Sequence, residues 1–193
     1  MHKTNTLRLT QLALLIAIQL VLSFTPLGFI MIPGMVSITL MHIPVIVGGI
    51  VMGPLYGGIL GLTFGLFSMY KATTAATSVI DQAFSPFLSG SPIASIVMCI
   101  LPRILLGVAA ALLYRALARK MKRQGPAIAV SAAGSAVIHT TLVLGLLWAL
   151  FDGLPLKQVF LTLISVNGLL EIAVAVLVAV GVCKPLMRVL DKK

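Results

Sequence analysis

The sequence predicts an all-α membrane protein in which six helices cross the bilayer and both termini lie in the cytoplasm. Three observations predict this class: the composition, the spacing of the apolar runs and the placement of the basic residues. Hydrophobic residues make up 60% of the 193 positions and charged residues only 9%, whereas a typical soluble domain contains about 25% charged residues. Mean hydropathy is +1.15. We therefore expect one integral membrane domain over residues 1–193, with lipid as its main solvent.

A membrane-spanning helix needs about 20 mostly apolar residues, and six runs approach this length. Pro26 and Gly28 end the first run in an uncharged loop, and Gly53 and Pro54 form a tight turn between the second and third runs. The second and third runs are short, which predicts tilting or local thinning of the bilayer. The first run has no small-residue cleavage site after it, so we expect it to be retained as a helix. The expected spans are Leu9–Phe24, Ile38–Met52, Tyr56–Tyr70, Ile96–Ala118, Ala127–Leu150 and Phe160–Val182.

The net charge of +10 is concentrated beside the ends of these runs. With six spans, three basic clusters fall on one side of the membrane, and only Lys71 and Lys157 fall on the other. Lys and Arg stay on the cytoplasmic side of membrane proteins, so this asymmetry predicts the orientation. Anionic lipid headgroups are the natural partners of such clusters, and the distribution argues against a nucleic-acid partner. The clusters are Lys3 and Arg8; Arg115, Arg119, Lys120, Lys122 and Arg123; and Lys184, Arg188, Lys192 and Lys193.

The longest polar segment, residues 71–95, is expected to lie outside the cell together with the loop at 151–159. Gln82 and Phe84, with Tyr70 and Phe87 nearby, are candidates for a lid over an outward-facing ligand pocket. A plain solvated loop would have the same composition, so both interpretations stay open.

Small residues recur at four-residue spacing in two of the predicted helices. Gly57, Gly61 and Gly65 share one helix face, as do Ala13 and Ala17. Small side chains allow another helix to approach closely, which is how helices associate in lipid. For the glycines this predicts packing within the chain, and for the alanines docking of a partner helix is an equal possibility.

Arg103 is the most informative single residue, because it lies about seven residues, or roughly 10 Å, into the fourth predicted span. A charge at that depth needs a counter-charge, a water-filled cavity or an anionic ligand. Glu171 in the sixth span is the intramembrane acid that could pair with it. Both a structural Arg103–Glu171 bridge and a polar ligand pocket are compatible with this placement.

Further candidate ligand contacts lie in the last two spans. Asn167 precedes Glu171 by four residues and shares its helix face. His139 and Thr140 lie in the middle of the fifth span. A lone histidine in an apolar helix is often only a hydrogen-bonded packing residue, and His42 is a weaker candidate for the same reason.

No catalytic residue, cofactor or metal site is predicted. The chain has no G-x-x-x-x-G-K-[ST] phosphate loop, so it is not expected to hydrolyse ATP by that route. Only four acidic residues are present, which leaves little material for an enzyme. Cys99 and Cys183 lie in different apolar runs, without other ligands at metal-binding spacing, and a disulfide between them is not expected.

Three segments together resemble the substrate-binding S components of energy-coupling factor (ECF) transporters, and with the basic N-terminus and first helix the resemblance covers nearly the whole chain. The segments are SITLMHIPVIVGGIVMGPLYGGILGLTFGLFS (Ser37–Ser68), FSPFLSGSP (Phe84–Pro92) and LPRILLGVAAALLYR (Leu101–Arg115).

The resemblance implies a six-helix subunit of a bacterial plasma-membrane importer that captures one vitamin from outside. It also implies association with a transmembrane coupling protein, on which Ala13 and Ala17 would dock, and with two ATPase subunits that supply the energy. The ligand pocket would be built from the last three helices and the outer loops.

The segments TLMHIPVIVG and PRILLGV are most similar to pantothenate-type members, and Arg103 would suit a carboxylated vitamin. Folate, riboflavin or a purine- or pyrimidine-like substrate stays open. So does a stand-alone transporter or facilitator that works without ATPases, and more remotely an intramembrane enzyme.

Overall fold

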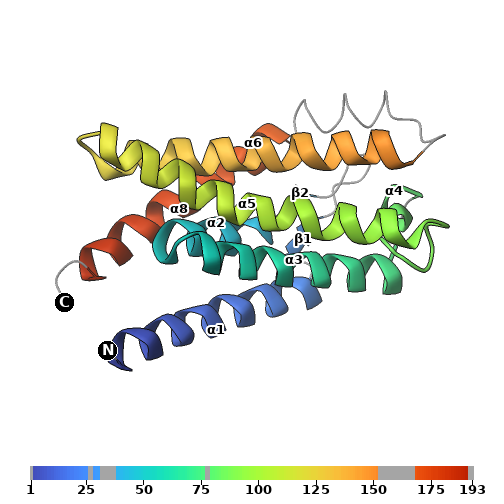
Figure 1. Cartoon of the computed structure of the whole chain (residues 1–193), viewed down its shortest axis with the longest axis horizontal. Helices are drawn as coiled ribbons and strands as arrows, with labels where there is room; N and C mark the ends of the chain where they lie inside the picture. Colours follow the sequence, from blue (N-terminus) through green and yellow to red (C-terminus); the bar gives the residue numbers. More distant parts are fainter. Residues whose placement is uncertain (1, 26–27, 31–37, 77–78, 152–167, 191–193) are drawn as a thin grey trace.

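The computed structural model describes residues 2–25, 28–30, 38–76, 79–151 and 168–190, which form helices and one short hairpin (Figure 1). Strands β1 (Phe29–Ile30) and β2 (Ile38–Thr39) pair antiparallel. The described chain is otherwise helical, as expected for the all-α class, and this two-residue pairing is an addition that the sequence analysis did not predict. The second predicted helix begins at residue 42 instead of 38, because residues 38–39 pair with β1. The helices are α1 (His2–Phe24), α2 (His42–Met52), α3 (Pro54–Thr74), α4 (Val79–Ala83), α5 (Pro92–Lys120), α6 (Gln124–Leu150) and α8 (Gly168–Leu190).

Four helices within the described part of the chain are long and apolar enough to cross a membrane. α2 is shorter, at 11 residues. α3 has 21 residues, more than expected, but its glycines, serine and threonines dilute its apolar character. The start of the predicted span at 160–182 lies outside the described residues, so the count of six spans stays a prediction. The four spans are Thr6–Phe24, Pro92–Lys120, Gln124–Leu150 and Gly168–Val189.

The long helices run side by side, and the basic clusters gather at one end of the bundle. At this end α1 begins, α8 ends and α5 turns into α6, whereas α4 lies at the opposite end (Figure 1). The positive-inside rule predicts that the basic end faces the cytoplasm. The end with α4 is called the outer end below, in keeping with that prediction.

The turn between α2 and α3 forms where the sequence predicts it. Gly53 has φ +101°, a backbone conformation that favours glycine, and its N–H donates to the Gly49 carbonyl at 3.0 Å. Pro54 begins α3, where a missing N–H costs no helical hydrogen bond. This turn lets α2 and α3 pack against one another as an antiparallel pair.

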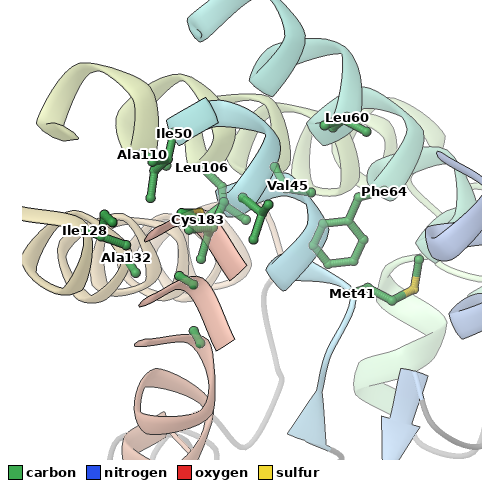
Figure 2. Packing of buried hydrophobic residues seen from close by; sticks show 14 residues of the cluster. Met41, Val45, Ile50, Leu60, Phe64, Leu106, Ala110, Ile128, Ala132 and Cys183 are labelled. Atoms are coloured by element: carbon green, nitrogen blue, oxygen red, sulfur yellow. The ribbon is translucent and has the colours of Figure 1, made fainter. Parts of the chain in front are cut away.

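The core surrounds α2, in which eight of the 11 residues are buried. Figure 2 shows Val45 and Ile50 of this helix among apolar side chains from α3, α5, α6 and α8. Large apolar side chains also cover the outside of the bundle; Leu177, Leu55 and Trp148 are each about 70% exposed. Such an outer surface suits lipid and not water.

A buried polar contact attaches α1 to α3. Gln19 is fully buried, and its Nε2 donates to the Leu60 carbonyl at 3.1 Å. The Thr63 hydroxyl donates to Gln19 Oε1 at 2.5 Å. Because apolar helices gain little from contact in lipid, hydrogen bonds of this kind hold neighbouring helices together.

A buried cationic site at the centre of the bundle

A glycine-lined contact between α3 and α5 determines where Arg103 sits. Gly61 lies against the Arg103 carbonyl so closely that a Cβ atom at position 61 would be 2.1 Å from that oxygen. Gly57 and Gly107 meet in the same way, backbone to backbone, and Gly65 lies against the Cys99 carbonyl. The three predicted glycines therefore pack inside the subunit, and they bring the backbone of α5 directly onto α3.

Pro102 sets the direction of the Arg103 side chain. A proline inside a helix has no N–H, so the carbonyl four residues earlier loses its helical partner. That carbonyl belongs to Met98, and Arg103 Nη1 donates to it at 2.7 Å. The guanidinium group thus turns back toward the outer end and replaces the hydrogen bond that its neighbour removes. Because α5 begins at Pro92, Arg103 lies about 16 Å along the helix, deeper than the sequence predicts.

The Arg103 guanidinium lies between two aromatic rings. Its Cζ is 5.4 Å from the centre of the Phe64 ring on α3 and 5.1 Å from the centre of the Phe84 ring. Both distances are within the range of a cation–π interaction. Arg103 is only 6% exposed, and Arg103 and Glu171 form no ion pair. No carboxylate of the described residues pairs with Arg103, and a buried cation without a counter-ion is costly.

Three side chains of neighbouring elements anchor the segment that carries Phe84. The Ser95 hydroxyl donates to the Ala83 carbonyl at 2.7 Å, and the Cys99 thiol donates to the Phe84 carbonyl at 3.1 Å. Ser95, Cys99 and Arg103 follow at four-residue spacing and share one face of α5. Thr73 of α3 and Ser85 share a further hydrogen bond of 2.9 Å. Phe84 is therefore held over Arg103 by a network of polar contacts and not by its ring alone.

Two histidines extend the buried polar cluster. The ring of His139 on α6 lies 6.1 Å from the Phe64 ring, and Arg103 and His42 are both within electrostatic reach of His139. The Nε2 atoms of His42 and His139 and the Nε atom of Arg103 are buried without a hydrogen-bond partner among the described residues. Leaving a buried polar atom unsatisfied costs about 1–3 kcal/mol. A bound polar solute would supply the missing partners.

Glu171 lies in the first turn of α8 and serves a different contact. Its Oε1 accepts a hydrogen bond of 2.6 Å from the backbone N–H of Thr39 in β2. The carboxylate thus joins the hairpin to α8 and does not neutralise Arg103. Asn167, predicted to share its face, lies outside the described residues.

The other predicted site residues lie apart from this cluster or at its edge. Thr140 follows His139 on α6 and is half-buried, whereas Gln82 at the end of α4 is exposed. Ala13 and Ala17 are both exposed on α1. Cys99 and Cys183 are buried and unpaired.

Two important members of the site could not be predicted from the sequence. Phe64 is one of eight phenylalanines, and nothing in its surroundings marks it as the ring that contacts both Arg103 and His139. The partner of Glu171 is a backbone N–H of Thr39, a group that every residue except proline carries. His42 appeared only as a weak candidate, because a lone histidine has no informative spacing.

Long apolar helices packed around a buried cation with aromatic neighbours define a helical membrane protein, the class to which membrane transporters belong. Residues 7–183 match the family described as ECF transporter, substrate-specific component, and the chain belongs to that family. A similar characterised relative is the "Pantothenic acid transporter PanT" of Lactococcus lactis subsp. cremoris (strain MG1363), which is 30% identical over 198 residues covering 97% of each chain. The family is a transporter family of the bacterial plasma membrane.

Proposed function

We propose that this chain captures pantothenate from outside the cell and delivers it to a membrane coupling protein driven by two ATPase subunits. The family supports a vitamin-sized solute and an energy-coupling module. The substrate assignment rests on Arg103, a buried cation that has no carboxylate partner among the described residues, in a chain similar over 97% of its length to a pantothenic acid transporter. Pantothenate has one carboxylate, which would complete this site.

The remaining polar groups of the ligand match the remaining polar groups of the cluster. Pantothenate carries two hydroxyls and an amide in addition to its carboxylate. In the proposed complex the carboxylate binds Arg103, and His139, Thr140, Asn167 and Glu171 bind the hydroxyls and the amide. Phe64 and Phe84 would flank the bound molecule, and Gln82 would lie at the outer rim.

The proposed transport cycle requires partners, since no nucleotide-binding motif is present in the sequence. In this proposal the exposed face with Ala13 and Ala17 docks on the coupling protein, and the outer segment at residues 79–91 faces the medium. The six spans and the cytoplasmic position of both termini belong to the same proposal.

A paired-ligand titration tests the substrate. Pantothenol is pantothenate with an alcohol in place of the carboxylate, so it isolates the contribution of the charge. The purified chain in neutral detergent is titrated with both ligands by isothermal calorimetry, with riboflavin and folate as further solutes. We expect saturable binding of pantothenate and at least about 100-fold weaker binding of pantothenol. Equal affinity for both ligands, or saturable binding of riboflavin or folate alone, would contradict the proposal.

A second experiment tests the partners. The tagged chain is expressed with its own coupling protein and ATPases, isolated from membranes and reconstituted in vesicles. Uptake of labelled pantothenate should require both ATP and the partner subunits. Uptake by vesicles that contain this chain alone would favour a stand-alone transporter instead.

A further inference from the structure

A second polar region lies at the basic end of the bundle, far from the Arg103 site. The start of α6 and the last turns of α8 enclose a surface hollow of about 410 Å³. Among the described residues its lining is strongly basic and includes no acidic side chain. The lining residues are Arg123, Gln124, Gly125, Pro126, Lys184 and Arg188.

The positive charge of the hollow is not neutralised by the described part of the chain. Arg123, Lys184 and Arg188 are all exposed and form no ion pair with a described residue. Glu171 lies 13 residues before Lys184 on α8, or about 20 Å along the helix. Asp191 follows Arg188 by three positions and lies outside the described residues; counting it, three cations still face one acid.

The backbone at the start of α6 adds to this positive field. The first N–H groups of a helix have no helical partner and carry a partial positive charge. Arg123 occupies the N-cap position without a side-chain cap hydrogen bond. A Cβ atom at Gly125 would meet nothing within 4 Å, so the approach to this backbone is open.

The depth of the hollow indicates the source of its ligand. One side of the hollow is the first turn of a candidate membrane span, Gln124–Leu150, and the other is the end of another, Gly168–Val189. The ends of spans lie at the level of the lipid headgroups. An anion that reaches this position from the membrane is the phosphate of a phospholipid headgroup.

We propose that this hollow is a binding site for the headgroup phosphate of an anionic phospholipid, held by Arg123, Lys184 and Arg188. The two helices that it joins carry His139 and Glu171 further along. The site is independent of the proposed vitamin, because it lies at the other end of both helices.

The test compares two triple variants that remove the same charge from the same end of the molecule. In R123Q/K184Q/R188Q the hollow loses its cations; in R119Q/K120Q/K122Q the adjacent basic turn loses three cations that do not line it. Each protein in neutral detergent is titrated with phosphatidylglycerol and with phosphatidylcholine, and bound lipid is counted by native mass spectrometry. Inorganic phosphate is added as a competitor in a separate arm.

We expect the wild-type chain and the control triple variant to bind phosphatidylglycerol in preference to phosphatidylcholine, with affinities within about twofold of each other. The hollow variant should lose about tenfold or more in affinity. An equal loss in both variants would show diffuse charge attraction and overturn the site. Displacement of the lipid by millimolar phosphate would show a free-anion site and overturn the lipid assignment. The single variant R123Q is measured as well, and circular dichroism checks its fold. This variant keeps the test valid if the triple variant does not fold. Unchanged lipid binding by R123Q would remove Arg123 from the site.

Discussion

Replacing Gly61 with alanine tests whether backbone contact between α3 and α5 holds the Arg103 site together. The new Cβ would lie 2.1 Å from the Arg103 carbonyl oxygen, 2.5 Å from its carbon and 2.7 Å from the Ile104 Cα. None of these atoms belongs to a side chain that can rotate away. The two helices must therefore separate by about 1 Å to restore an ordinary contact.

Two opposing contributions determine how much Gly61→Ala changes the free energy of unfolding. Overpacking of a close contact costs typically about 1–3 kcal/mol, and a clash with backbone belongs at the upper end of that range. Alanine in place of glycine inside a helix contributes about 1 kcal/mol in the favourable direction. We expect Gly61→Ala to destabilise the chain by about 2 kcal/mol, and to weaken ligand binding because Arg103 moves with its carbonyl.

Gly58, three residues before Gly61 on the same helix, provides a matched control. A Cβ there would meet only side-chain methyl groups, Val108 Cγ2 at 3.6 Å and Ile104 Cγ2 at 3.8 Å, which are ordinary contacts. Gly58→Ala should therefore be neutral or stabilising by up to about 1 kcal/mol. The expected difference between the two variants is about 3 kcal/mol, or roughly 6–12 °C in the unfolding midpoint.

Thermal unfolding in detergent measures this difference. The buried thiols of Cys99 and Cys183 react with a fluorogenic maleimide only when the helices separate, and circular dichroism provides a second probe. Equal midpoints for the two alanine variants would refute the close backbone contact and, with it, our account of how Arg103 is positioned.

Three further predictions concern the site and its partners. Arg103→Ala should weaken pantothenate binding by at least about 100-fold, whereas Arg103→Lys, which keeps the charge but loses the planar fork, should weaken it by about tenfold; calorimetry measures both. Ser95→Ala frees the Ala83 carbonyl and loosens the segment that holds Phe84, so ligand dissociation measured by stopped flow should become about 2–10-fold faster. Leucine at Ala13 or Ala17 should block assembly with the coupling protein in a pull-down and leave ligand binding unchanged.

Each of these predictions has its own control. Pantothenol binding should be unaffected in Arg103→Ala, and an equal loss for both ligands would mean that the variant is misfolded or that Arg103 does not meet the carboxylate. Ser131→Ala removes a buried hydroxyl that, within the described part of the chain, donates to the Ala127 carbonyl of its own helix. The rate of ligand dissociation from this variant should match that of the wild type. Leu14→Ala changes an exposed α1 side chain between the two alanines; assembly lost in this variant too would argue against a specific small-residue face.

Much of the architecture could be predicted because it depends on local composition. The predicted C-terminal ends of three helices agree with the structure to the residue: Phe24 for α1, Met52 for α2 and Leu150 for α6. The ends of the apolar runs and the Gly or Pro residues that follow mark these positions. The longer α3 and α5 could not be placed as well. Their extra turns, up to Thr74 and from Pro92, lie in the polar outer segment, where tertiary hydrogen bonds and not apolarity decide where a helix continues.

The sequence predicted the central residue of the candidate site but not the groups that contact it. Arg103 stood out because the desolvation of a charge in an apolar helix is costly wherever the helix packs. Glu171 was one candidate partner beside a ligand pocket, but this carboxylate accepts a hydrogen bond from the Thr39 N–H. The groups that contact the Arg103 guanidinium are the Met98 carbonyl and the rings of Phe64 and Phe84.

The sequence by itself determined the membrane class, the approximate spans, the gathering of the basic residues at one end and the presence of a buried cation. These properties follow from residue type and spacing, because the transfer of each side chain into lipid has a free energy of its own. Only the tertiary structure decided which groups meet the cation and which neighbour Glu171 binds. Such contacts depend on how closely helices approach and how they are rotated about their axes, and several of them are made by backbone atoms that every residue shares.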